Sequence, residues 1–184
     1  VYTFGGGGSD WRVSQALNNA MKDYDDPRLS LMTKPAAGGT MTITKPTTGE
    51  GVALIDVHVD FVKGTLDDAG LIQDQDYSWT ETATDLTITM PENTNYIGMP
   101  SRISPKLKGY MPGTMFSEPA DIITQVRNDE GKEQFPEVVM ASADSHFMIA
   151  EAIVKGLASG DANTYYQLGL EKAMAVWGTA PSAD

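Results

Sequence analysis

Histidine is the side chain best suited to acid–base work near neutral pH, and the chain has only 2 histidines. One of them, His146, follows Asp144 and Ser145, three residue types that cooperate in nucleophilic catalysis. A catalytic triad depends on placement in space rather than on adjacency, and no Gly-x-Ser-x-Gly turn accompanies these residues. We therefore interpret the segment as the beginning of a helix, where Asp144 or the nearby Ser142 caps the first turn.

The second histidine lies in the alternating run Asp56-Val57-His58-Val59-Asp60. If this run is a strand, its period of two places Asp56, His58 and Asp60 on one face. Such a face could bind a metal or simply face solvent, and we favour the solvated face. The wider apolar run, residues 52–62, fits either a strand or a helix, so its element type stays open.

Asp74, Asp76 and Ser78 repeat the spacing of the oxygen ligands in a calcium-binding loop. Trp79 stands where an EF-hand needs glycine, and Asp85 stands where it needs a bidentate glutamate, which excludes that motif. The sequence leaves open a looser calcium site in which Asp74 and Asp76 act together with backbone carbonyls. We assign no metal-binding or catalytic residue from the sequence, and we expect no other cofactor.

Aromatic side chains in polar or Gly/Pro-rich segments are the candidate ligand-binding residues. An aromatic face stacks on the apolar face of a ring, and Tyr and Trp add a polar group. The alternative for each is that it fills the core of an irregular domain, because large aromatic side chains are mostly buried. The candidates are Tyr77, Trp79, Tyr96, Tyr110 and Phe116.

Composition excludes several classes of function. The 184 residues include 13 Lys plus Arg against 25 Asp plus Glu, a net charge of -12 that disfavours nucleic acids and anionic membranes. The absence of cysteine excludes disulfides, thiolate catalysis and cysteine-bound metals in this chain. No run approaches the roughly 18 apolar residues of a membrane-spanning helix.

Three regions can be distinguished along the chain. In the first, residues 10–34, Asp10 caps a predicted helix over residues 11–24, and a short strand follows at residues 29–33 because Leu29, Leu31 and Thr33 alternate. That helix presents one apolar face, made of Val13, Leu17, Ala20, Met21 and Tyr24.

The second region, residues 35–136, is predicted to be irregular and rich in loops. Period-two alternation predicts short strands at residues 41–44 and 86–90. Residues 93–116 contain several Gly, Pro and aromatic residues, which predicts a long ordered loop of the kind that is usually functional.

The third region, residues 137–178, is predicted to be an antiparallel helical hairpin. The first helix covers about residues 143–158 and ends at Gly160, and Asp161 caps a second helix over about residues 162–177. The first helix is apolar on most faces, so one partner helix cannot hide it. Either the irregular middle covers the remaining face, or neighbouring repeats lie outside this chain.

Together these patterns predict a mainly α fold with a tetratricopeptide-like helical hairpin, a loop-rich middle and a few short β-strands. Residues 1–184 then form either one domain or the C-terminal portion of a longer domain. The uncovered helix favours an incomplete portion of a larger α-superhelical fold.

Four landmarks, in the same order, resemble those of one family. Residues 138–152 are similar to its signature, an apolar strand ending in Met, an acidic position, Phe, an apolar pair and Ala-Glu-Ala. The other landmarks are Asp26-Pro27-Arg28-Leu29, Tyr96-Ile97-Gly98-Met99-Pro100, and a second helix with Lys155-Gly156, Tyr165-Tyr166, Gly169-Leu170, Met174 and Trp177-Gly178. The chain resembles the SusD/RagB-like outer-membrane nutrient-binding lipoproteins of Bacteroidetes-type bacteria, most closely their SusD-like second branch.

The resemblance implies a surface-exposed outer-membrane lipoprotein that is not an enzyme. Such a protein captures an oligosaccharide or another nutrient and delivers it to a SusC-like TonB-dependent transporter. Family members are longer and carry their lipid on an N-terminal cysteine, which implies that this chain is a C-terminal portion whose anchor lies elsewhere. Glu151 is expected to pair with Lys155.

The family's ligand contacts vary, so none is assigned through its motifs. Two other functions stay open from the sequence alone. One is a hydrolase acting on glycan or peptide through a carboxylate pair or His146, and the other is a structural or adhesive surface protein.

Overall fold

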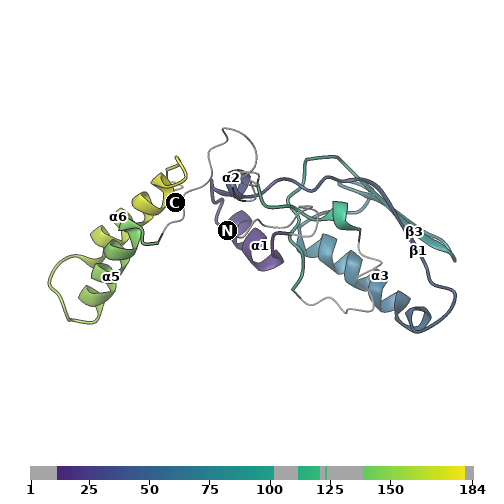
Figure 1. Ribbon diagram of the computed structural model, residues 1–184, viewed down its shortest axis with the longest axis horizontal. Helices are drawn as coiled ribbons and strands as arrows, with labels where there is room; N and C mark the ends of the chain where they lie inside the picture. The colour runs from purple at the N-terminus through teal and green to yellow at the C-terminus, as the bar shows by residue number, and fades with distance from the viewer. Residues whose placement is uncertain (1–11, 102–111, 121–122, 124–138, 181–184) are drawn as a thin grey trace.

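The computed structural model describes residues 12–101, 112–120, 123 and 139–180. Figure 1 shows three parts in a row, with α1 and α2 between the β-sheet with its helix α3 and the hairpin of α5 and α6. Helix predominates in this arrangement, as predicted. The elements in chain order are α1 Gln15–Asp23, α2 Leu29–Met32, β1 Gly39–Thr44, α3 Gly51–Asp68, β2 Ser78–Glu81, β3 Asp85–Met90, the 3₁₀ turn η3 Gly113–Met115, α5 Ser142–Val154 and α6 Ala162–Ala175.

Helix α1 begins later than the sequence pattern predicts. Val13 is extended because its amide donates to the Ser117 carbonyl at 2.9 Å and its carbonyl accepts from Met99 at 2.7 Å. Ser14 then caps the helix, with its hydroxyl accepting from the Leu17 amide at 3.3 Å. Asp10, the predicted cap, lies outside the described residues.

The predicted apolar face of α1 is only partly correct. Val13 and Met21 are buried, whereas Leu17, Ala20 and Tyr24 are exposed. The buried position between them is polar: Asn18 is fully buried and donates from Nδ2 to the Tyr96 carbonyl at 3.1 Å. A contact with a distant segment therefore decides which side of the helix faces inward.

The predicted strand at residues 29–33 is wrong, because Leu29–Met32 forms the helical turn α2. Asp26 starts this turn: its side chain accepts the Arg28 amide at 2.9 Å, and its carbonyl accepts the Leu29 amide at 3.0 Å. Only Thr33 is extended, where it forms a bridge with Pro119. An alternation of three residues is too short to outweigh these hydrogen bonds.

The middle of the chain is more regular than predicted. Its ambiguous apolar run lies within α3, an 18-residue helix. Val59, Val62 and Leu66 recur at helical spacing and are buried against the sheet. The predicted common polar face is wrong, since His58 is fully buried while Asp56 and Asp60 are exposed.

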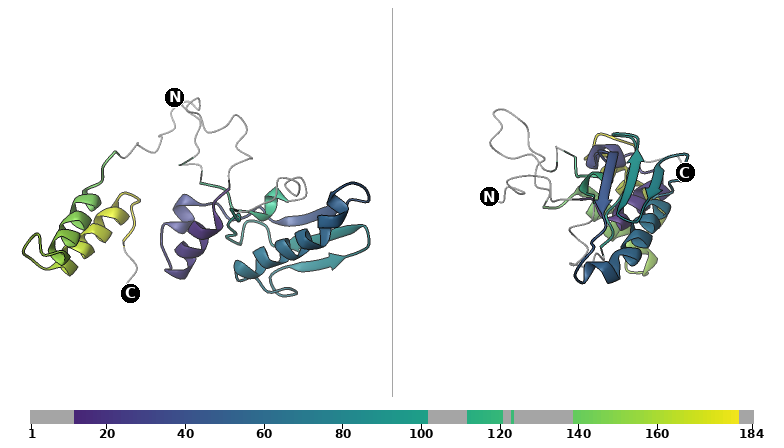
Figure 2. Two further views of the ribbon diagram at one scale, coloured as in Figure 1. Left: turned by 90° about the horizontal axis from the view of Figure 1, so that it is seen from below. Right: turned by 90° about the vertical axis from the view of Figure 1, so that its right-hand side faces the viewer.

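The sheet has the strand order β1-β3-β2, and both pairings are antiparallel. Both strands that alternation predicts in the middle region, residues 41–44 and 86–90, are confirmed as β1 and β3. One face of the sheet packs on α3 (Figures 1 and 2). The alternation of the strands places threonine and serine on the other face. The core between sheet and helix contains Met41, Ile43, Val59, Val62, Leu66, Tyr77, Leu86, Ile88, Met90, Ile97, Met115 and Phe116.

The segment around Gly98 connects α1 to this core. A Cβ at position 98 would lie 2.4 Å from the Gln15 Cα, so only glycine fits against the start of α1. The Ile97 amide donates to the Ser117 hydroxyl at 3.0 Å. Residues 102–111 of the predicted long loop lie outside the described residues.

The helical hairpin is confirmed, including Asp161 as the cap of α6, whose carboxylate accepts the Asn163 amide at 3.1 Å. Asp144 caps the beginning of α5 by accepting the Ala141 amide at 2.9 Å. The predicted end of the first helix is wrong: α5 ends at Val154, where Gly156 adopts the left-handed conformation at φ 71°.

Helix α5 keeps apolar side chains in solvent within the described part of the chain. Met148, Ile149 and Val154 are exposed, so the described residues of the middle region leave this part of the hairpin uncovered. None of the described helices is both long and apolar enough to cross a membrane.

Candidate ligand-binding site

A hollow of about 510 Å³ opens beside the edge strand β2. One wall comes from the turn that precedes β2, and the other comes from the end of β3. The register of the sheet brings the two walls together, because Ser78 lies directly opposite Thr89. The lining residues are Asp74, Gln75, Asp76, Tyr77, Ser78, Thr89, Met90 and Pro91.

Local hydrogen bonds fix the first wall. The Asp76 carboxylate accepts the Ile72 amide at 2.8 Å, and the Asp76 amide donates to the Ile72 carbonyl at 2.8 Å. The Asp74 amide donates to the Tyr77 carbonyl at 2.7 Å. Asp74 itself adopts the left-handed region at φ 64°, a conformation that Asp and Asn tolerate better than other non-glycine residues. The turn is therefore closed before any ligand arrives.

The two aspartates of this turn have different roles. Asp76 is committed to the backbone of its own turn. The Asp74 side chain is exposed, and one of its carboxylate oxygens lies 3.5 Å from Gln73 Nε2, a weak contact. Its carboxylate can therefore accept hydrogen bonds from the hydroxyl groups of a ligand. The side chains of Gln75, Ser78 and Thr89 can also form hydrogen bonds with these hydroxyl groups.

Tyr77 anchors this wall to the hydrophobic core. It is 3% exposed, and its ring meets that of Trp79 edge to face with centroids 6.4 Å apart. Its hydroxyl has no hydrogen-bond partner in the part of the chain that the structure describes. Burial raises the pKa of Tyr77, and the negative charges of Asp67 and Asp74 raise it further. The phenol therefore stays protonated across the neutral range.

The other aromatic candidates from the sequence are dispersed. Trp79 packs against the core but is partly exposed, and Tyr96 is also partly exposed. Phe116 is 1% exposed and belongs to the core, so its ring offers no face to a ligand. Tyr110 lies outside the described residues. Of the four candidates that the structure describes, only Tyr77 lines the hollow.

The other interpretations of charged residues follow from local contacts. Asp144 caps α5, which confirms the capping interpretation, and the ring of His146 lies 6.3 Å from that of Tyr165 between centroids. Within residues 12–101, 112–120, 123 and 139–180, no group of three His, Asp or Glu side chains is arranged to hold a metal ion. Asp74 and Asp76 therefore belong to no such group.

Two further hollows have different characters. One, of about 700 Å³, lies along the hairpin and is largely apolar; Phe147, Val154 and Tyr166 line it, and the predicted Glu151–Lys155 ion pair borders it. The other, of about 320 Å³, is polar, and its Gln15 and Asp68 side chains already bond to each other at 3.0 Å. The hollow beside β2 combines apolar surface with unused polar groups, so it is the candidate site.

Sequence patterns alone did not identify Gln75 or Thr89 as site residues, and they indicated Ser78 only through the spacing of a calcium-binding loop. The alternation that predicts β3 does indicate that Thr89 faces away from the core. Its position opposite Ser78 depends on the pairing of β2 with β3, which no local pattern specifies.

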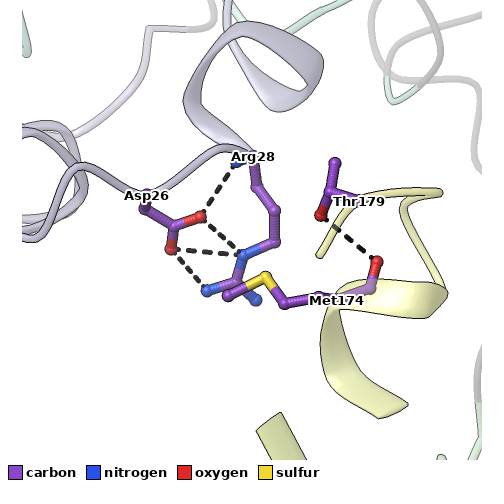
Figure 3. A network of polar contacts seen from close by, with 4 residues as sticks. All are labelled: Asp26, Arg28, Met174 and Thr179. Atoms are coloured by element: carbon purple, nitrogen blue, oxygen red, sulfur yellow. Dashed lines mark hydrogen bonds and ion pairs between the residues drawn. The ribbon is translucent and has the colours of Figure 1, made fainter. Parts of the chain in front are cut away.

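Two landmark segments of the sequence have clear structural roles. Arg28 binds Asp26 through two nitrogens, Nε at 2.9 Å and Nη2 at 2.6 Å (Figure 3). Figure 3 also shows the Met174 side chain of α6 pointing toward the Arg28 guanidinium, and Met174 is buried. Both landmarks therefore stabilise the fold.

Comparisons with known proteins give the family. Residues 76–184 match the second SusD-like family model, described as starch-binding and associating with the outer membrane. A solved structure of a chitin-binding protein aligns with a TM-score of 0.50 and 18% identity, over 93% of this chain and 27% of that chain. This likeness concerns the fold, and the chain spans only 27% of that protein's length. No curated protein matches. Because the family model covers more than half of the chain, this protein belongs to the SusD-like family.

Proposed function

We propose that this protein binds a neutral oligosaccharide at the bacterial surface through the hollow beside β2. The observation that carries the proposal is the composition of this hollow, which places Asp74, Gln75, Ser78 and Thr89 around the exposed apolar surface of Pro91. Sugar rings present hydroxyl edges and apolar faces, and a site with both kinds of surface is complementary to them. The starch-binding description of the family and the chitin-binding structural neighbour support the same ligand class.

Binding without cleavage is the proposed chemistry. Hydrolysis of a glycosidic bond requires two carboxyl groups that act as acid and base or nucleophile. In this hollow the Asp76 carboxylate is held by the Ile72 amide, which leaves Asp74 as an acceptor for ligand hydroxyls. The Tyr77 and Trp79 rings stiffen the wall on which these groups stand.

The proposed setting is the outer membrane, where a SusC-like TonB-dependent transporter receives the oligosaccharide. The family's association with the outer membrane supports this location. Attachment through a lipid outside this chain is part of the same proposal. Tyr96 and Tyr110, the remaining loop aromatics, are proposed as ligand contacts only in that larger assembly.

Isothermal titration of the 184-residue chain with maltotriose and with N,N′,N″-triacetylchitotriose tests the proposal. We expect at least one of them to bind, and we expect Asp74→Asn to weaken binding by roughly tenfold because one charge-assisted hydrogen bond is lost. Asparagine tolerates the left-handed backbone at this position, so the turn is retained.

Asp25→Asn is the matched control. Asp25 is also exposed and left-handed, at φ 46°, but it lies in the turn after α1 and does not line the hollow. Its substitution should leave affinity unchanged. Equal effects of the two substitutions, or chromatographic detection of shortened saccharides, would contradict a binding-only site at Asp74.

A further inference from the structure

The face of the sheet opposite α3 carries two rows of hydroxyl groups. In the first row Thr40 of β1 lies opposite Thr89 of β3, which in turn lies opposite Ser78 of β2. The second row repeats this pattern two residues farther along each strand, with Thr42 opposite Thr87 and Thr87 opposite Thr80. Adjacent strands are about 4.8 Å apart and alternate residues about 6.7 Å apart, so six hydroxyls form a nearly regular grid.

These hydroxyl groups keep unused hydrogen-bonding capacity. Thr40 and Thr89 are linked through their Oγ1 atoms at 3.0 Å, and Thr42 and Thr87 at 3.5 Å. Each hydroxyl has one donor and two acceptor positions, so a pair that shares one hydrogen bond can still bind other groups. All members of the grid except the half-buried Thr87 are exposed, and no described element covers them.

The absence of charged side chains from the grid restricts the kind of molecule that fits this face. The chain has a net charge of -12, yet none of the six side chains in the grid is charged. A face without Lys or Arg has little attraction for phosphate groups, and one without large apolar side chains gains little from burial against a second protein. A neutral polyhydroxylated chain matches both the polarity of the grid and its lack of charge. The next row along this face carries the negative charge of Asp85, opposite Thr44, which also disfavours anionic ligands.

The grid continues into the candidate site. Ser78 and Thr89 belong to the first row and also line the hollow beside β2. A ligand held in the hollow by Asp74 and Gln75 therefore meets the grid where it leaves the hollow. Thr42, Thr80 and Thr87 lie farther along the same face.

We propose that this hydroxyl grid is an extended subsite that holds the further sugar units of a linear neutral glycan whose end occupies the hollow. This inference rests on the proposed function and adds a preference for chain length. The alternative explanation is that threonine is common in exposed strands because of its strand propensity. Strand propensity does not require the hydroxyl group, whereas a subsite does.

Thr42→Val/Thr87→Val separates the two explanations. Valine keeps the branched shape and the strand propensity of threonine but removes the hydroxyl, and Thr42→Ser/Thr87→Ser keeps the hydroxyl. Isothermal titration of the full 184-residue chain would compare maltotriose with maltoheptaose, and triacetylchitotriose with hexaacetylchitohexaose. Circular dichroism would verify that both variants are folded.

For the native chain we expect the longer member of a bound series to bind roughly tenfold more tightly than the trisaccharide. The valine variant should lose this difference and keep its trisaccharide affinity, while the serine variant retains both. If the valine variant keeps the length preference, or if the native chain has none, the grid is not a subsite, although the proposed function stands. Absence of binding to all four saccharides would overturn both proposals.

Discussion

The ring of Phe147 in α5 occupies the space that a side chain at position 169 in α6 would need. A Cβ on Gly169 would lie 2.5 Å from the Phe147 Cε1 atom and 2.7 Å from Cδ1, closer than nonbonded carbons approach. The same ring lies 5.6 Å from that of Tyr166 between centroids. Phe147 and Gly169, which lie in two of the family's landmark segments, are thus in contact. This contact determines how closely α5 and α6 pack.

We expect Gly169→Ala to destabilise the protein. The added methyl group would push the Phe147 ring out of the interface, and overpacking of this kind costs about 1–3 kcal/mol. Urea unfolding followed by circular dichroism measures the change. The matched control is Gly64→Ala in α3, where nothing lies within 4 Å and alanine should stabilise the helix by about 0.5–1 kcal/mol. Opposite signs for these two helical glycines are the expected result, and equal signs would contradict the contact.

Gly98→Ala should be at least as damaging, because here the new methyl would meet backbone atoms. The Cβ would lie 2.4 Å from the Gln15 Cα and 2.7 Å from the Ser14 carbonyl oxygen, neither of which can move aside as a side chain does. We expect a loss of about 3 kcal/mol in the free energy of unfolding. Loss of hydrogen-exchange protection at the Met99 and Gln15 amides would accompany it. Unchanged protection there would show that α1 does not depend on this close approach.

Asp26→Asn should weaken the turn between α1 and α2 by about 2 kcal/mol near pH 7, since charge-assisted hydrogen bonds to Arg28 are lost. Hydrogen bonding to Arg28 lowers the pKa of the Asp26 carboxyl below its ordinary value of 3.8. A lowered pKa stabilises the folded state above the unfolded-state pKa of about 4, and this contribution fades as pH falls through the folded-state value.

The measurement is the difference in unfolding free energy between the native chain and Asp26→Asn as a function of pH. We expect this difference to be constant from about pH 5 to 7 and to shrink below about pH 4. A difference that is independent of pH down to about pH 2 would contradict the ionic origin of this contribution.

Tyr77→Phe should leave the protein equally stable or stabilise it by up to about 1 kcal/mol, because the native hydroxyl is buried without a partner among the described residues. The raised pKa of Tyr77 also predicts that stability falls as pH rises above about 10, the unfolded-state value, because ionisation is easier in the unfolded chain. Thermal unfolding of both proteins at about pH 8 and pH 10.5 measures the two effects. The alkaline loss should be smaller in Tyr77→Phe. A loss of more than about 1 kcal/mol at pH 8 in Tyr77→Phe would show that the hydroxyl is bonded.

Local signals explain which elements could be predicted from the sequence. The alternation of β3 and the Asp161 cap of α6 are complete within a few residues, and both predictions are confirmed. The element α2 was predicted as a strand because the side chain and backbone of Asp26 determine its turn, which alternation does not reveal. The inner face of α1 depends on the hydrogen bond from Asn18 to the distant Tyr96 carbonyl.

The candidate site was predicted less completely than the fold for the same physical reason. Tyr77 was among the predicted aromatics, and for the acidic turn before β2 the sequence left open only a looser calcium site, with no metal residue assigned. The hollow itself requires Ser78 and Thr89 to lie opposite each other, a consequence of strand pairing over a distance along the chain. Phe116 was proposed for the site because its flanking residues suggest a loop, but tertiary packing buries it in the core.

The most direct test of the central claim is a chemical-shift titration of the ¹⁵N-labelled chain with a saccharide that binds. The account predicts that the amide signals of Asp74, Gln75, Ser78 and Thr89 shift together and saturate with one dissociation constant. Signals of the hairpin, such as those of Val154 and Tyr166, should not move. Shifts confined to the hairpin, with the Asp74–Ser78 turn unaffected, would contradict the assignment of the hollow beside β2 as the ligand site.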